Sequence, residues 1–119
     1  MKFQDNIPIY VQIANDIKRQ IIAGALPEGE KLLSIREYSG HYAVTALTMQ
    51  RALALMESEK IIHTKKGVGS FVMANIQDTL KRSMLKEQVQ AFIAELFKMG
   101  LTGEEIITLV KEEIKNGEY

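Results

Sequence analysis

The residues best suited to binding chemistry are cations gathered with glycines in one short stretch of the chain. Between positions 60 and 71 there is no acidic residue, and the nitrogen-bearing side chains are Lys60, His63, Lys65 and Lys66. Gly67 and Gly69 permit a tight turn and a close approach of the backbone to a ligand. Such a basic edge can bind phosphates even though the whole chain has no net charge. The lysines could instead protect a sheet edge against aggregation.

No catalytic constellation accompanies this basic stretch. The chain has no cysteine, which excludes disulfides, thiolate metal sites and a cysteine nucleophile. His41 is isolated, His63 is expected in a strand, and Gly67-x-Gly69 is not followed by a helix as a nucleotide fingerprint requires. The acidic residues near the end form a solvated face: Glu104, Glu105, Glu112 and Glu113. We therefore predict that the protein is not an enzyme and uses no cofactor or metal.

Length and composition limit the architecture. A chain of 119 residues has room for one ordinary domain and a short appendage. We expect a winged domain at residues 1–75 and a helical tail at residues 76–119. Nine Lys and Arg against seven Asp and Glu give the first part +2, and six against eight give the second −2. The chain starts without the apolar core of a signal peptide and has no membrane-length apolar run, so we expect a cytoplasmic protein.

The elements before the basic stretch must position it. Pro8 suits the start of a helix that ends near Gly24, because apolar residues recur at helical spacing and Lys18 lies off that stripe. The stripe consists of Tyr10, Ile13, Ala14, Ile17 and Ile21. Pro27-Glu28-Gly29 is a turn signal before a very short extended piece.

Two short helices should follow. Ser34 and Glu37 form a capping box at the start of the first, which Gly40 and the 43–45 region interrupt. Thr45 can cap the second helix, which runs to about residue 58. Two short helices joined by a tight turn are typical of a helix-turn-helix, whose second helix can enter the DNA major groove.

Predicted strands at 61–64 and 70–73 surround the basic turn and would form a wing beside that groove. After a connector at 75–78, a helix is expected over 79–98, and Thr102 with Glu105 caps another. Two helices in 44 residues cannot form their own core, so they must pack on the first domain or on a second copy. The fold class is therefore α+β and mostly helical, a winged helix-turn-helix domain with a two-helix dimerisation tail. The dimerisation residues are Leu85, Val89, Phe92, Ile93, Leu96, Ile106, Ile107 and Val110.

Several separated motifs carry a family resemblance over roughly residues 7–73. They are PIYxQI, IxxGxLxxGxxL, SxRE, TxQRAL and TxxGxGSFV. In this order and spacing they resemble the N-terminal domain of the GntR family of bacterial transcription regulators. The short tail resembles the YtrA subfamily. The resemblance implies a homodimeric regulator that binds a double-stranded DNA operator, often a repressor of a nearby operon that commonly encodes an ABC transporter.

The resemblance also implies site residues. Arg36 would contact DNA, Thr45 and Thr48 would bind backbone phosphates, and the tip at Lys66 and Gly67 would approach the minor groove. The whole candidate set is Arg36, Thr45, Ala46, Leu47, Thr48, Gln50, Arg51, Lys65, Lys66, Gly67 and Gly69.

Departures from the family pattern matter as well. Ala46 and Gln50 stand where many members carry arginine, which removes the usual bidentate guanine contacts. Leu33 replaces a common proline, and Ala43 replaces the usual turn glycine, which predicts slight strain there. Arg51 could contact DNA or pair with an acid such as Glu37. Two alternatives remain open, a winged helix that binds only proteins and a small-molecule effector.

Overall fold

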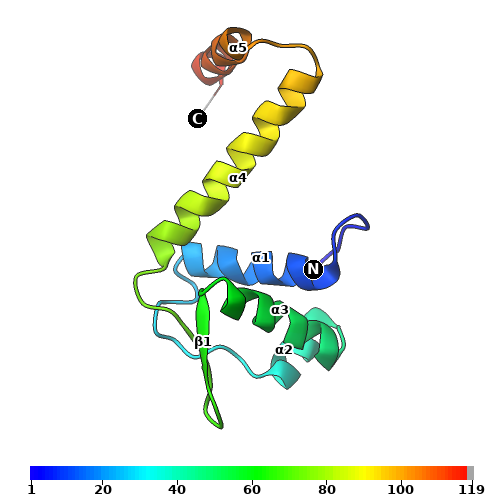
Figure 1. The fold of residues 1–119 in the computed structure, drawn as a ribbon, viewed down its shortest axis with the longest axis vertical. Helices are drawn as coiled ribbons and strands as arrows, with labels where there is room; N and C mark the ends of the chain where they lie inside the picture. The colour runs from blue at the N-terminus through cyan, green and yellow to red at the C-terminus, as the bar shows by residue number, and fades with distance from the viewer. Residues whose placement is uncertain (118–119) are drawn as a thin grey trace. The chain divides into compact units, whose positions relative to one another are not determined.

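The computed structural model describes residues 1–117, which form five helices and one two-stranded sheet (Figure 1). The elements are α1 (Ile9–Ile22), α2 (Ile35–Tyr42), α3 (Ala46–Ser58), β1 (Ile62–Lys65), β2 (Gly69–Val72), α4 (Gln77–Lys98) and α5 (Gly103–Asn116). The chain is divided into two compact units. The first is Met1–Lys81, and the second begins at Arg82. We call them the winged unit and the tail unit. The order of elements confirms the predicted winged helix-turn-helix with two further helices.

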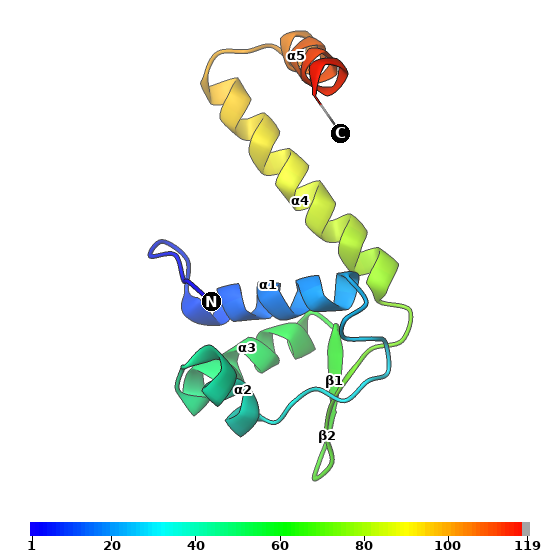
Figure 2. The same ribbon diagram turned by 180° about the vertical axis from the view of Figure 1, so that it is seen from behind.

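The core of the winged unit lies between α1 and α3, which run side by side in both ribbon views (Figures 1 and 2). Ile13 and Ile17 of α1 are fully buried, as are Met49 and Met56 of α3. Their spacings of four and seven residues place them on one face of each helix. This packing holds α3 by one side and leaves its other side to solvent.

Lys18 also belongs to this interface, so the prediction that it lies off the packed face was wrong. Its side chain is only 10% exposed, and its Nζ lies 2.7 Å from Glu59 Oε1. The aliphatic stem of a lysine can cover apolar surface while its ammonium group reaches an acid. Because Glu59 is the C-cap residue of α3, this ion pair ties α1 to the end of α3.

Helix α2 begins and ends at identifiable residues. The predicted capping box is confirmed: Ser34 Oγ accepts from the Glu37 N–H at 3.1 Å, and the Glu37 carboxylate accepts from the Ser34 N–H at 3.1 Å. Gly40 does not interrupt the helix, contrary to the prediction, and lies within it. The helix ends because Ala43 adopts the left-handed conformation, with φ 55° and ψ 49°.

A polar network joins α2 to α1. The Tyr42 hydroxyl donates to Asp16 Oδ2 at 2.6 Å, and the Gln20 amide lies within 3.4 Å of both groups. Burial, and then the hydrogen bond to the Asp16 carboxylate, raise the pKa of Tyr42 far above its usual value. The hydroxyl therefore stays protonated and keeps donating, which holds the end of α2 against α1.

The hairpin is antiparallel, with Ile62 opposite Val72 and Lys65 opposite Gly69. Its strands lie one residue nearer the turn than predicted. The preceding chain joins the sheet, since the Leu32 N–H donates to the Ser70 carbonyl at 2.8 Å. The Thr64 hydroxyl donates to Glu57 Oε2 of α3 at 2.9 Å. The hairpin is thereby fixed to α3 and to the segment before α2.

Helix α4 begins at Gln77, so the predicted connector over residues 75–78 was too long. A distant residue supplies the start: the Glu28 carboxylate accepts from the Gln77 N–H at 2.9 Å. That backbone hydrogen bond holds the pKa of Glu28 below its usual value. The Gln77 amide also donates to the Ile22 carbonyl at 2.9 Å. The first turn of α4 is thus part of the winged unit.

The tail unit contains the rest of α4 and α5. The second predicted capping box is confirmed, because Thr102 Oγ1 accepts from the Glu105 N–H at 3.2 Å while the Glu105 carboxylate accepts from the Thr102 N–H. No described helix is both long enough and apolar enough to cross a membrane.

Candidate nucleic-acid interface

The start of α3 exposes a polar and apolar face away from the core. Ala46, Leu47, Gln50 and Arg51 are all exposed, and Leu47 is 57% exposed. These positions fall at i, i+1, i+4 and i+5, which places them on one side of the helix. The opposite side is the one buried against α1. The candidate residues of α3 therefore share a surface on a firmly held helix.

Two hydroxyls mark the beginning of this face. Thr45 is confirmed as the N-cap, since its Oγ1 accepts from the Thr48 N–H at 3.1 Å. The Thr45 and Thr48 hydroxyl oxygens also lie 2.9 Å apart in a hydrogen bond. The remaining N–H groups of the first helical turn have no partner within the helix and favour an anion nearby.

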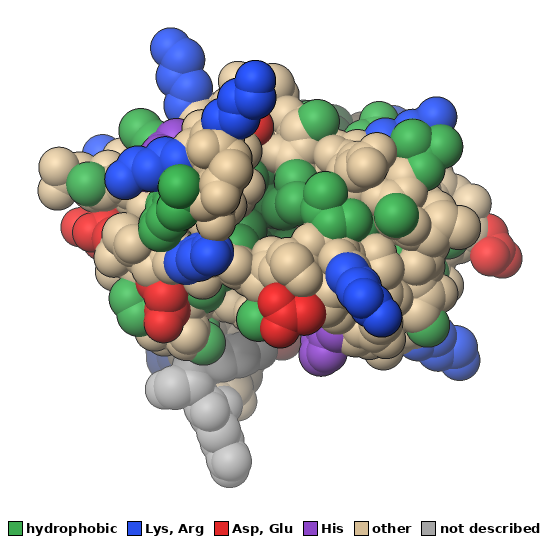
Figure 3. All heavy atoms as spheres, turned by 90° about the horizontal axis from the view of Figure 1, so that it is seen from below, with side chains coloured by type: hydrophobic (Ala, Val, Ile, Leu, Met, Phe, Trp, Pro, Cys, Tyr) green, Lys and Arg blue, Asp and Glu red, His purple; other side chains and the backbone are tan. Residues whose placement is uncertain are grey.

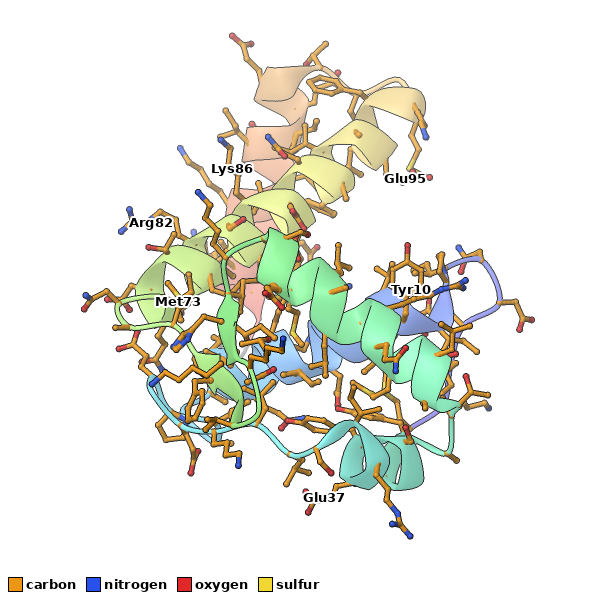
Figure 4. All side chains as sticks on the ribbon, turned by 60° about the horizontal axis from the view of Figure 1, so that its bottom comes forward. Tyr10, Glu37, Met73, Arg82, Lys86 and Glu95 are labelled. Atoms are coloured by element: carbon orange, nitrogen blue, oxygen red, sulfur yellow. The ribbon has the colours of Figure 1, made fainter. Side chains whose placement is uncertain are left out.

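Arg36 is the second residue of α2 and is exposed. Its neighbour Glu37 is occupied by the capping box, and the Ser34 N–H holds the pKa of the Glu37 carboxyl below its usual value. Within residues 1–117 no ion pair joins Arg51 to any acid. Arg51 instead lines an open groove of about 430 Å³ with Tyr10 of α1. Figure 4 labels Glu37 on α2 and Tyr10 on α1.

The tip of the hairpin carries the predicted cations. The Val68 N–H donates to the Lys65 carbonyl at 2.9 Å, and Gly67 has φ +76°, which closes the turn. Lys65 Nζ lies 5.0 Å from the centre of the Phe71 ring, so its side chain reaches over the neighbouring strand β2. Lys66 is exposed at the turn itself.

Lys31 is a candidate that the sequence interpretation missed. Gly69 has φ +145°, and a Cβ there would lie 2.6 Å from Lys31 Cε, so the lysine stem crosses directly over the glycine. The positive φ favours glycine at this position. The signal in the sequence was a cation directly before an apolar residue in an extended segment. Because side chains alternate along such a segment, Lys31 points outward when Leu32 is buried.

Lys31, the hairpin and the start of α2 enclose one groove. Its volume is about 530 Å³. The lining residues from these three elements include Lys31, Ser34, Lys65, Gly67, Gly69 and Ser70. Figure 3 shows this face, with Lys and Arg side chains spread around hydrophobic ones. The structure thus brings the hairpin residues together with the start of α2, while Ala46, Leu47 and Gln50 do not line the groove.

The tail candidates fall into three groups by exposure. Leu85, Val89, Phe92 and Ile107 are each more than half exposed. Ile93, Leu96 and Val110 are half-buried, and Ile106 is already buried within a single copy. Leu85, Val89, Phe92 and Leu96 follow one another at helical spacings of four, three and four. They form a continuous apolar stripe on α4, whose charged residues Arg82, Lys86 and Glu95 are labelled in Figure 4.

Comparison with known proteins decides what this arrangement belongs to. Residues 9–72, from the start of α1 to the end of the hairpin, match the family described as bacterial regulatory proteins, gntR family. The chain belongs to the GntR family. Within residues 1–117 no three His, Cys, Asp or Glu side chains are grouped to hold a metal ion.

Relatives extend the match over the tail. HTH-type transcriptional regulator YhcF of Bacillus subtilis (strain 168) is 35% identical over 118 residues, 98% of each chain. HTH-type transcriptional repressor YtrA of the same organism is 31% identical over 120 residues, 96% of this chain and 92% of that one. A solved GntR family transcriptional regulator from Listeria monocytogenes has a TM-score of 0.81 at 37% identity, covering 92% of this chain and 98% of that one. This GntR protein is a DNA-binding transcription regulator, and its family is not one of enzymes.

Proposed function

We propose that the protein is a homodimeric repressor that binds a palindromic operator and controls a nearby operon. The observation that carries this proposal is the exposed start of α3, which presents Leu47 and Gln50 on a helix fully buried along its other side. Recognition helices of helix-turn-helix proteins read bases with this end. In a dimer the two α3 helices would enter successive major grooves about 34 Å apart.

Phosphate contacts come from the groups that surround α3. Arg36 lies at the start of α2, Thr45 and Thr48 at the start of α3, and Lys66 at the hairpin tip. Lys65 and Lys31 add charge beside the groove, and Gly67 and Gly69 let the hairpin backbone approach the minor groove. These contacts supply most of the affinity but no sequence information. Bases are read by Ala46, Leu47 and Gln50, with Arg51 at the margin.

The tail joins two copies of the chain into a dimer. Residues 1–75 bind DNA, and residues 76–119 hold the dimer together. The apolar stripe of α4 and the exposed Ile107 of α5 have no cover within the described residues of one chain. Burying them against the same surfaces of a partner is favourable and gives the two-fold symmetry that a palindrome requires.

Repression and its target rest on relatives. The relative YtrA is described as a repressor. A dimer on a promoter would block RNA polymerase, and the regulated operon would be of the kind that such regulators commonly control, one that encodes an ABC transporter. The position of the bound site relative to the promoter tests the sign of regulation.

The test is DNA binding by the full chain, using sequences selected from a random pool. We expect Arg36→Ala with Lys66→Ala to weaken retardation of the selected DNA by more than tenfold. The slope of log affinity against log salt should also become shallower, by about one for each phosphate that the variant no longer neutralises.

A matched control is Lys111→Ala with Lys115→Ala, which removes two exposed cations from α5 and should leave binding unchanged. Selected DNA that binds the double variant as well as the wild type would overturn the assigned contacts. A chain that selects no DNA and shows no salt-dependent binding would favour the protein-interaction alternative.

A further inference from the structure

Leu47 is an apolar side chain of α3 that does not pack into the core of the winged unit. The other large apolar residues of α3 nearest to it, Met49 and Leu53, are buried in the winged unit. Leu47 instead lies 57% exposed one residue after Ala46, which is exposed as well. The start of this helix therefore exposes two adjacent apolar side chains on its surface.

Gln50 stands beside this apolar pair. Residues 47 and 50 are neighbours on a helix surface because they are three positions apart. Within residues 1–117 the Gln50 amide forms no hydrogen bond, as is also true of the exposed Gln88 and Gln90, whereas Gln12, Gln20 and Gln77 use theirs within the winged unit. Its carbonyl oxygen and NH₂ group are thus both available, one as acceptor and one as donor.

The edges of an A·T base pair in the major groove complement these two apolar side chains and the Gln50 amide. The thymine C5-methyl is the only apolar group in the major groove, and adenine presents an acceptor at N7 beside a donor at N6. A glutamine amide can bond adenine through both groups at once. Guanine presents two acceptors, O6 and N7, and suits the paired donors of arginine instead. No arginine or lysine lies between residues 45 and 50.

The flanking hydroxyls keep this surface in place without competing for bases. Thr45 and Thr48 are hydrogen-bonded to each other and to the backbone at the start of α3. Arg51, the nearest cation on the helix, lines the groove beside Tyr10 of α1. Ala46, Leu47 and Gln50 are thus uncharged, and Arg51 lies at the edge of the same side of α3.

We propose that this surface makes the protein specific for A·T base pairs at the centre of each half-site. Gln50 bonds an adenine, and Leu47 with Ala46 contacts the methyl groups of neighbouring thymines. This inference rests on the proposed function and adds to it the identity of the bases that are read.

The experiment uses the full chain and the DNA that it selects from a random pool. We expect A·T pairs at the central positions of both half-sites. Replacing a contacted thymine by uracil removes only the methyl group and should weaken binding by about 2- to 5-fold. Replacing the contacted adenine by 7-deazaadenine removes the N7 acceptor and should also weaken binding. Changing that A·T pair to G·C should lower the affinity by about 5- to 100-fold.

Matched variants assign these effects to residues. Leu47→Ala should reduce the difference between thymine and uracil at the thymine that Leu47 contacts, and Gln50→Arg should shift the selected base towards guanine. Lys66→Ala is the control, since it should weaken all sequences alike and leave the base preference unchanged.

Each outcome decides between the two proposals. Selected half-sites with G·C at their centre, or uracil substitutions without effect on the wild type, would overturn the A·T inference while DNA binding stands. Failure to select any DNA would overturn the proposed function itself.

Discussion

The winged unit and the tail unit treat their apolar residues in opposite ways. In the winged unit Ile17 and Met56 are fully buried, whereas Val89 and Phe92 of the tail are 54% and 51% exposed. Both units contain a helix that begins with a capping box, so helix-start signals do not account for the difference. The winged unit has a sheet and three helices that cover one another, and the tail has two helices with an open stripe. The first unit can be stable alone, and we predict that the second is completed by a partner.

This difference predicts how stability depends on protein concentration. A unit that buries its own core unfolds at the same denaturant concentration at any dilution. A unit that is completed by a second copy gains stability by mass action as the protein becomes more concentrated. Substitutions in the core of the winged unit and in the apolar stripe of the tail unit should therefore respond differently to protein concentration.

The largest effect should come from Ile17→Ala in the core of the winged unit. Removing a fully buried isoleucine side chain costs about 2–5 kcal/mol of the free energy of unfolding, because it loses burial and leaves a cavity. Denaturant unfolding followed by circular dichroism measures this loss. Val89→Ala in the tail should cost little in dilute protein and more when the protein is concentrated. Equal losses at all concentrations for both variants would show that the tail is not completed by a partner.

Next in size is the effect of charge on the tail stripe. Phe92→Glu with Leu96→Glu should yield a monomer by light scattering, because two carboxylates would have to be buried at the proposed interface. Operator affinity should fall by about 10- to 100-fold, since the second half-site is no longer bound as part of the same particle.

The control for this pair places the same charges elsewhere on α4. Gln90 and Ala94 are exposed and lie on the side of the helix away from the stripe. Gln90→Glu with Ala94→Glu should keep the dimer and the affinity. A dimer that survives the stripe variant would refute the assignment of Phe92 and Leu96.

The starts of three helices were predictable because their causes are local in the chain. The capping boxes at Ser34 and Thr102 and the N-cap at Thr45 are confirmed at the predicted positions, because each is made by residues three apart. The start of α4 was not predictable in this way, since Glu28 caps it from 49 residues earlier. Lys18 was misplaced for the same reason, because its partner Glu59 lies on another helix.

The candidate site shows the same division. Motif spacing was enough to nominate Arg36, Gln50 and Lys66. Lys31 could not be nominated, because its relation to Gly69 exists only once the segment before α2 joins the hairpin. The exposure of Leu47 likewise depends on how α3 packs against α1. Local patterns therefore identify the elements of the interface, and tertiary packing determines which side chains it presents.

A smaller effect is expected at the turn between α2 and α3. Ala43 has φ 55°, a left-handed conformation that alanine adopts at a cost and glycine does not. Ala43→Gly should therefore raise the free energy of unfolding of the winged unit by up to about 1 kcal/mol. Thermal unfolding at two protein concentrations should show the same gain at both.

Gly40→Ala is the counterpart within the same helix. Gly40 lies inside α2, and an added Cβ there would meet no atom within 4 Å. This variant should also stabilise, by about 0.5–1 kcal/mol, because alanine loses less backbone entropy than glycine. A destabilised Ala43→Gly variant would mean that the left-handed turn carries no strain.

The most direct comparison of the two units comes from their capping boxes. Ser34→Ala and Thr102→Ala each remove one cap, at a cost of about 1 kcal/mol. Only the loss in Ser34→Ala should be independent of protein concentration, because its helix belongs to the unit with its own core. A loss in Thr102→Ala that is equally independent would place α5 in a self-sufficient fold.

Acidification tests the same boxes through their glutamates. The hydrogen bonds from the Ser34 and Thr102 N–H groups hold the pKa of Glu37 and of Glu105 below the usual value in the folded state. A lowered pKa means that the stabilisation is complete above the unfolded value and is lost as pH falls through the folded one. Thermal unfolding between about pH 6 and about pH 3 should therefore show the wild type losing stability. Glu37→Gln should make the stability of the winged unit depend less on pH. Glu105→Gln should have the same effect on the tail unit only at protein concentrations at which the tail is dimeric.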